Sequence, residues 1–251
     1  MKIIEKTINI LTKNNNEPKV DKDEFISCFN NPIIQESILT ELANIFELLR
    51  TAMTQSMGIQ HVTLKELRTT IDTMNNVFDD GIGVEKSFIT SMVGESNDMS
   101  AFILSPFKNS ELWVIQLHDN FGGVGELGAH GMNCVSMHEN IDTGDLYMVG
   151  VIVIGPIDDQ KVFTQVLQHE ATHYLLEYTR TFVDKELINR IDCVENFTEF
   201  LADYLQFIVY KSDKYNGYCK FEEYAYKHFN DRVLKKYKPF MEILNTDCSH
   251  R

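Results

Sequence analysis

The chain has 251 residues, of which 43% are hydrophobic and 11% aromatic, so it can bury a core and is not a mainly disordered protein. Its formal net charge of −14 argues against nucleic acid or an anionic membrane surface as the main partner, since both attract positively charged proteins. The five cysteines are scattered without a C-x-x-C pair, which indicates reduced thiols rather than a disulfide framework.

The first third of the chain is predicted to be mainly helical. Apolar residues recur at three- and four-residue steps from Asp21 to about Phe78. A capping-box pattern that starts at Thr63 predicts one further helix over Leu64 to Val77. We therefore expect residues 1–80 to form a helical section that packs against a second part, residues 81–251.

Strand-forming residues dominate the middle of the chain, and turn-forming residues separate the runs. The predicted strands are Phe88 to Val93, Ala101 to Leu104, Leu112 to Leu117, Cys134 to Met137 and Leu146 to Ile154. The segment Gly123 to Gly128 formally matches the dinucleotide fingerprint G-x-G-x-x-G, but no helix is predicted after it, so we interpret it as a flexible connection. A mixed sheet followed by a helix, capped by Asp158 or Asp159, is the expected order.

That helix places two histidines and a glutamate where metal chemistry can use them. His169 and His173 lie four residues apart, so a helix presents both imidazoles on one face, within reach of a single zinc ion. Glu170 lies beside them without being an obvious ligand. A general base that takes a proton from water needs this position. The histidines outside the helix, which are more typical of solvated side chains, include His118, His130 and His138.

A later predicted helix carries three carboxylates on one face. Glu195, Glu199 and Asp203 stand four residues apart, and their mutual repulsion favours a bound cation or a buried partner. Glu195 and Glu199 are both open as a third metal ligand, and a solvated acidic face is the other interpretation. Glu177 is disfavoured because it would have to reach back along the helix of His173.

The H-E-x-x-H motif of His169, Glu170 and His173 resembles that of the zincin metallopeptidases. No glycine or third histidine follows at the metzincin spacing, whereas Glu199 and Asp203 match the spacing of the gluzincin branch. The resemblance implies an α+β, zincin-like fold: a mixed twisted sheet, an active-site helix and a glutamate-bearing helix. It also implies one Zn²⁺ per chain, with Glu199 as the third ligand, Asp203 orienting His169, and Glu170 as the general base.

The activity implied by the resemblance is hydrolysis of a peptide or protein substrate, with no role for nucleic acid or a membrane. The strand that ends at Ile154 is expected to bind an extended substrate by edge addition. A tyrosine or histidine would stabilise the oxyanion, and the available residues are Tyr178, Tyr204, Tyr210, Tyr215, Tyr218 and His228. The alternative hypothesis is a zinc-binding interaction protein without proteolytic activity. A third is a helical interaction protein that carries the motif by accident.

The end of the chain is predicted to form an aromatic-rich helix from Phe221 to about Tyr237 that stops at Pro239. The helix is locally basic, which indicates either a solvated face or a surface for an acidic partner. Its basic residues are Lys227, Arg232, Lys235, Lys236 and Lys238. The N-terminus lacks the continuous apolar core of a signal peptide, and no segment reaches the roughly 20 apolar residues of a membrane span, so a cytoplasmic location is expected.

Overall fold

The computed structural model describes residues 21–54, 60–62, 69, 83–139, 142–192, 196–211 and 217–248. The elements are α2 (Lys22–Phe29), the π-helical segment η1 (Ile33–Ile38), α3 (Leu39–Thr54), β1 (Gln60–Val62), α5 (Gly83–Val93), β2 (Met99–Leu104), β3 (Ser110–Leu117), α6 (Gly122–Glu126), β4 (Gly131–Glu139), β5 (Leu146–Ile154), α7 (Gln160–Phe182), α8 (Lys185–Asp192), α9 (Phe197–Lys211), α10 (Gly217–His228) and α11 (Asp231–Cys248). Apart from Thr69, the predicted helix Leu64 to Val77 lies outside the described residues, as does Glu195.

The sheet is mixed, with the strand order β1-β2-β3-β5-β4. β3 and β5 run parallel, and the other neighbouring strands pair antiparallel. The predicted bounds of β5 are correct, and its apolar run is buried on both faces from Met148 to Ile154. β5 lies between β3 and β4, so the expectation that it adds a substrate strand at its edge is wrong. The edge strand on this side of the sheet is β4.

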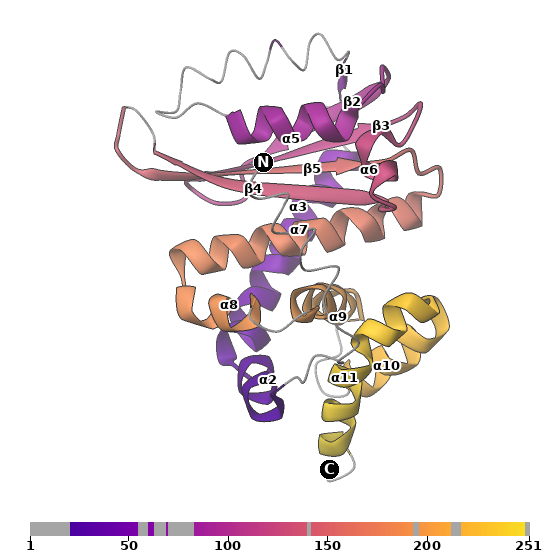
Figure 1. The fold of residues 1–251 in the computed structure, drawn as a ribbon. Coiled ribbons are helices and arrows are strands. Elements are labelled where there is room, and N and C mark those ends of the chain that lie inside the picture. The colour runs from indigo at the N-terminus through magenta and orange to yellow at the C-terminus, as the bar shows by residue number, and fades with distance from the viewer. Residues whose placement is uncertain are drawn as a thin grey trace, which may run out of the picture.

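The two faces of the sheet are covered by different helices. α5 and α6 lie over one face, and α7 lies along the other (Figure 1). Successive residues of β5 point to opposite faces of the sheet. Val151 packs in the hydrophobic cluster that contains residues of α5, and Ile152 packs in the cluster that contains residues of α7. Gly150 faces α7, where a Cβ atom would lie only 2.3 Å from Cδ2 of Tyr174. The missing side chain at Gly150 therefore lets α7 lie close against the sheet.

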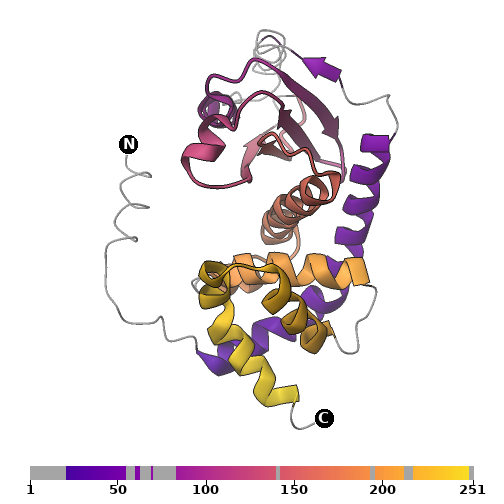
Figure 2. The ribbon, with the colours of Figure 1, turned by 90° about the vertical axis from the view of Figure 1, so that its right-hand side faces the viewer.

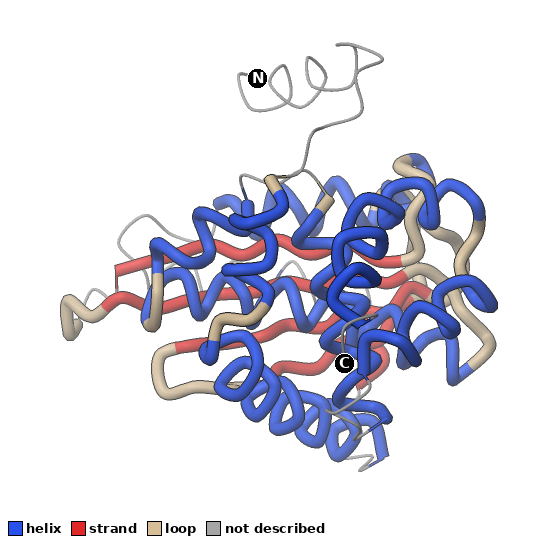
Figure 3. Tube along the Cα trace, turned by 90° about the horizontal axis from the view of Figure 1, so that it is seen from below, coloured by secondary structure: helices blue, strands red, loops and turns tan. Residues whose placement is uncertain are grey.

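A layer of helices lies on the other side of α7 from the sheet and contains α2, α8, α9, α10 and α11 (Figures 1 and 2). Seen from below, helices lie in front of the strands of the sheet (Figure 3). Aromatic rings fill the layer: the ring centroids of Phe25 and Phe197 are 4.8 Å apart, and those of Phe200 and Phe240 are 5.1 Å apart. α3 packs against both α7 and α9, so the N-terminal helices share a core with the motif helix. The structure confirms the α+β class, and the division at residue 80 stays a prediction.

Two predicted elements have the wrong type. The segment predicted as a strand from Phe88 to Val93 belongs to helix α5, because Glu85, Ile89 and Met92 recur at helical spacing and are buried. The segment interpreted as a flexible connection contains the short helix α6. Its Gly123 lies so close to α5 that an added Cβ would lie 2.1 Å from the backbone oxygen of Ser91.

The C-terminal helix was also predicted with wrong ends. The chain breaks at Asn230, whose side-chain oxygen accepts a hydrogen bond from the backbone N–H of Val233 at 3.1 Å and so caps α11. Pro239 does not end the helix but lies inside α11. Tyr237 and Phe240 are buried on either side of it, so packing holds both halves of the helix in place. Among the described residues, no helix is long and apolar enough to cross a membrane.

Candidate metal centre

The motif helix α7 begins where the sequence predicts it to begin. Of the two candidate caps, Asp159 is the one used: its Oδ1 accepts hydrogen bonds from the backbone N–H groups of Lys161 at 2.8 Å and Val162 at 3.2 Å. Nearly three turns later His169 and His173 lie one turn apart on a half-buried face of the helix. The sheet supports the opposite face of α7, so both imidazoles are held towards the helical layer.

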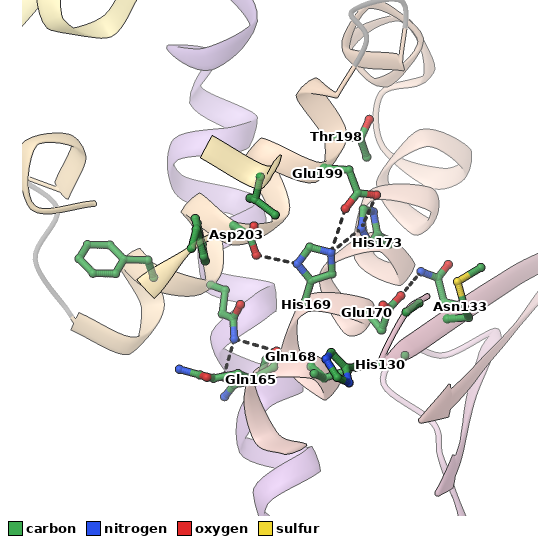
Figure 4. Close-up of a pocket in the computed structure, with 18 of the residues that line it drawn as sticks. His130, Asn133, Gln165, Gln168, His169, Glu170, His173, Thr198, Glu199 and Asp203 are labelled. Atoms are coloured by element: carbon green, nitrogen blue, oxygen red, sulfur yellow. Dashed lines mark hydrogen bonds and ion pairs between the residues drawn. The ribbon is translucent and has the colours of Figure 1, made fainter. Parts of the chain in front are cut away.

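Three potential metal ligands converge on one point (Figure 4). Nε2 of His169 lies 3.1 Å from Nε2 of His173 and 3.2 Å from Oε2 of Glu199. Oε1 of Glu199 lies 3.5 Å from Nε2 of His173. Ligands at 2.0–2.1 Å around a tetrahedral zinc ion are separated by about 3.3–3.4 Å. The three spacings lie close to this value, although the two Glu199 distances involve different carboxylate oxygens, so the donor set suits zinc after a small adjustment of that carboxylate.

Charged neighbours set the charges of the donor side chains. Nδ1 of His169 lies 2.7 Å from Oδ1 of Asp203, which leaves Nε2 directed at the other donors. Burial is the largest single effect on the pKa of His169 and acts to lower it, but the carboxylates of Asp203, Glu199 and Glu170 together raise that pKa well above its usual value. Zinc binding would therefore displace a proton from Nε2 of His169. Burial likewise acts to raise the pKa of Glu199, yet hydrogen bonds from the two histidines hold it far below the ordinary range. Glu199 is therefore an ionised, half-exposed carboxylate.

A tyrosine from the last helix completes this arrangement. The hydroxyl group of Tyr237, in α11, donates a hydrogen bond of 2.5 Å to Oδ2 of Asp203. Tyr237 is buried, and burial together with the Asp203 carboxylate raises its pKa, so the group stays a donor at neutral pH. The chain of contacts from Tyr237 through Asp203 to His169 joins α11, α9 and α7. Sequence analysis did not identify Tyr237, which is 34 residues from Asp203 in the chain.

Glu170 is held by the sheet rather than by the histidines. Its Oε2 accepts a hydrogen bond of 2.6 Å from the side-chain amide of Asn133, in β4. Gly131, two residues earlier, allows β4 to approach: a Cβ there would lie 2.6 Å from Cγ1 of Val166 and 3.3 Å from Cγ of Glu170. The Glu170 carboxylate is not among the converging donors. Asn133 is a second site residue that sequence analysis missed, since only the folded sheet brings it to α7.

The donors open into a pocket with a volume of about 1230 Å³. Residues of β4, α7, α9, α10 and α11 line it, and the sides of the pocket thus belong to both layers of the protein. Along α7, residues one turn apart line the pocket in a continuous stripe: Lys161, Gln165, His169, His173 and Glu177. A pocket of this size, with polar groups that converge near its middle, has the form of a ligand-binding site.

The other candidate residues are distributed on both sides of the sheet. His130 lines the pocket, whereas Nε2 of His118 lies 2.8 Å from the hydroxyl of Ser100, away from it. His138 is buried against Glu85 on the α5 face. Glu177 lines the pocket, but its carboxylate forms an ion pair with Arg180 at 3.2 Å and is not one of the converging donors.

Of the six residues available to stabilise an oxyanion, three have described side chains, and of these three only His228 lines the pocket. Tyr178 stacks on Phe107 with ring centroids 3.7 Å apart, and Tyr204 is buried beside Phe29. Neither of these two candidates lines the pocket, because their rings pack in the core. The side chains of Tyr210, Tyr215 and Tyr218 lie outside the described part of the chain. The pocket contributes two further donors that were not considered for this role, His130 and Tyr224.

Comparison with known proteins adds no family to this description. The chain matches no protein-family model, no curated protein and no solved structure. The functional interpretation therefore depends on the geometry of the site itself.

Proposed function

We propose that this protein is a zinc-dependent metallopeptidase of the gluzincin type. The observation that carries the proposal is the convergence of His169, His173 and Glu199 at spacings suited to a tetrahedral zinc ion. Two further features support it. Glu170 lies beside these donors without joining them, and the donors face a large pocket rather than a closed core. Three protein ligands with an open position are typical of catalytic zinc sites.

His169, His173 and Glu199 would hold the ion. When bound, zinc supplies Lewis acidity, which lowers the pKa of water towards about 7 and polarises a peptide carbonyl. Glu170 takes the proton from the attacking water and then delivers it to the leaving amine. Asn133 holds Oε2 of Glu170, while Oε1 forms no hydrogen bond with any described residue and is the oxygen that accepts the proton. Asp203 and Tyr237 keep His169 in the orientation that presents Nε2.

The substrate class follows from the sheet edge beside the site. β4 is an edge strand, and its Gly131 and Asn133 line the pocket. An extended peptide can pair with the free backbone groups of such a strand, which would place its carbonyl groups along the pocket. The proposal includes the zincin-like arrangement of sheet, motif helix and glutamate helix. It also includes the cytoplasmic location, with which the free thiols of Cys28 and Cys134 agree.

The alternative is a zinc-binding protein without proteolytic activity. It is favoured by the origin of the donors, because an ion shared by α7 and α9 ties together two layers of the fold. A purely structural site has no use for a carboxylate next to the first histidine or for an amide that orients this carboxylate. Glu170 and Asn133 therefore favour the peptidase.

Metal content and peptide hydrolysis, measured on the same preparations, test the proposal. We expect near one zinc per chain in the wild type and in Glu170→Gln, and much less in Glu199→Gln. Hydrolysis of a mixed peptide library should fall by roughly 10²–10⁴-fold in Glu170→Gln, the usual contribution of a general base. Glu177→Gln is the matched control, since Glu177 lines the same pocket but is not among the converging donors.

Two results would contradict the proposal. Wild-type protein that takes up no zinc after reconstitution would show that the donors do not form a zinc site. Zinc-loaded protein that hydrolyses no peptide in the library would favour the structural alternative.

A further inference from the structure

The pocket has opposite charges at its two ends. Lys161 lies at the beginning of the α7 stripe that lines the pocket, and Glu177 lies at its end, with His169 and His173 between them. At 1.5 Å per residue, Lys161 is roughly 12 Å from His169 along the helix axis. A second lysine lines the pocket, Lys236 in α11, one residue before the tyrosine that contacts Asp203.

Lys161 and Lys236 bring positive charge to the lining of the pocket. Neither Lys161 nor Lys236 forms an ion pair with a described residue, and both are exposed. Polar side chains without a carboxylate line the same pocket: the amide of Gln165 donates to the hydroxyl of Tyr224 at 3.3 Å, and the ring of Tyr224 packs on His228 with centroids 4.5 Å apart. The acids nearer the middle of the pocket, Asp203 and Glu199, are already engaged with His169.

The basic residues of the C-terminal helices are thus not equivalent. Lys236 faces the pocket, whereas Lys235 and Arg232 do not line it, and the amino group of Lys238 lies 3.6 Å from Glu242 in an ion pair along α11. The sequence leaves open whether these basic residues form a solvated face or a surface for an acidic partner, and in the structure one of them, Lys236, lines the pocket of the candidate site.

The opposite end of the pocket has no free cation among the described residues that line it. Glu177 and Asp192 lie there, and Arg180 bridges them, with distances of 3.2 Å to Glu177 and 2.8 Å to Asp192. One guanidinium group is thereby shared between two carboxylates, and Glu199 adds a third acid nearby. The pocket therefore changes from positive to negative along the direction of α7.

We propose that the pocket selects peptide segments with acidic side chains, which are held by the ammonium groups of Lys161, at the beginning of α7, and Lys236, in α11. This inference rests on the proposed function, since it assigns a substrate preference to the same site. An extended peptide covers about 3.3 Å per residue, so the acidic residues lie within about four positions of the bond at the metal. The net charge of −14 repels acidic peptides elsewhere on the surface, so the two lysines determine where such a peptide binds.

Peptide binding without cleavage tests the inference. The probe is a short fluorescent peptide with a run of glutamates, compared by fluorescence anisotropy with the same peptide carrying glutamines. Both are titrated with zinc-loaded full-length Glu170→Gln protein. We expect the glutamate peptide to bind more tightly, and the preference to fall by roughly 3- to 10-fold when Lys161→Gln and Lys236→Gln are combined. Added salt should reduce the preference as well.

The control is the pair Lys185→Gln and Lys235→Gln, which removes the same charge from exposed positions that do not line the pocket. A charge reversal, Lys161→Glu with Lys236→Glu, should shift the preference to a lysine-containing peptide. All four lysines are exposed, and thermal melts would verify that the variants fold.

Equal binding of the two peptides by the parent protein would overturn the inference, and so would an equal loss of preference in the control pair. The outcome is separable from that of the proposed function. If the protein prefers acidic peptides through its lysines but hydrolyses no peptide, the proposed peptidase activity is contradicted and the binding preference stands. If it hydrolyses peptides without any acidic preference, only the proposed preference is contradicted.

Discussion

On each side of the sheet, a histidine in the described part of the chain contacts a carboxylate, and the two histidines, His169 and His138, differ in what they can still bind. On the α7 side, Asp203 binds Nδ1 of His169, and Nε2 remains directed at His173 and Glu199. On the α5 side, Glu85 binds Nε2 of His138, and the side chains of the pair are only 0% and 1% exposed.

The comparison shows why a histidine beside an acid is not by itself a site. His138 has its Nε2 engaged, and the hydroxyl of Ser136 contacts the same carboxylate, so this pair is closed within the core. The pair on the α7 side has a nitrogen that points to two further donors and a pocket that a ligand can enter. Ligand binding therefore requires a free donor atom and access, in addition to charge.

The largest expected effect is loss of zinc on the α7 side only. His173→Ala removes one of three donors, so we expect zinc affinity to fall by more than the 10–100-fold that follows loss of a residue that merely orients a ligand. Isothermal titration with zinc measures it. The control is His130→Ala, a histidine of the same pocket outside the donor group, which should keep the wild-type affinity. Unchanged zinc binding by His173→Ala would contradict the claim that the donors on the α7 side form a zinc site.

The reverse outcome is expected on the α5 side. His138→Ala leaves the Glu85 carboxylate buried without its main partner, so the free energy of unfolding should fall by about 3–5 kcal/mol while zinc binding persists. Urea denaturation measures the loss. The double variant His138→Ala with Glu85→Ala should recover part of the lost stability, because the unpaired carboxylate is removed as well. A loss below about 1 kcal/mol would show that the pair does not need its histidine.

A smaller effect is expected where α7 contacts the sheet. Gly150→Ala places a Cβ against the buried ring of Tyr174 and 3.2 Å from Cδ1 of Leu112, which is buried as well, so we expect about 1–3 kcal/mol of destabilisation. The thermal midpoint measures it, with Gly83→Ala as the control, since no atom lies within 4 Å of a Cβ at Gly83. Equal stability of both variants would mean that Tyr174 moves aside freely.

The smallest effect tests the outer end of the chain of contacts on the α7 side. Tyr237→Phe removes the donor to Asp203 but keeps the ring, which packs edge-on against Phe200. We expect zinc binding to weaken by roughly 10-fold, or about 1.4 kcal/mol. Tyr178→Phe is the matched control, because its ring stacks on Phe107 away from the donors. Equal affinity in the two variants would show that Asp203 orients His169 without help.

Features encoded by neighbouring residues could be predicted from the sequence. The apolar run of β5, the Asp159 cap and the four-residue spacing on α7 and α9 all depend on local patterns. The spacing indicates which side chains share a helix face. The spacing does not determine that α9 lies against α7. The choice of Glu199 as the third ligand therefore depends on the resemblance of the motif to the zincins.

Contacts between distant parts of the chain could not be predicted. Asn133 is 37 residues from Glu170, and only the position of β4 at the sheet edge brings the two together. Local preference also misled where packing decided the outcome. Phe88 to Val93 is rich in strand formers, yet its helical spacing buries Ile89 and Met92 against the sheet. Pro239 is tolerated in a helix because buried neighbours compensate for one lost hydrogen bond.

The origin of the donors in two layers has a consequence for the lifetime of the folded protein. His169 and Glu199 are 30 residues apart in the chain, and an ion between them is bound only by the folded form. At free zinc concentrations roughly a thousand times the dissociation constant, such an ion would add about 4.1 kcal/mol to the free energy of unfolding. A chelator would then act as a denaturant, and the supply of metal would set how much of the protein escapes unfolding and degradation.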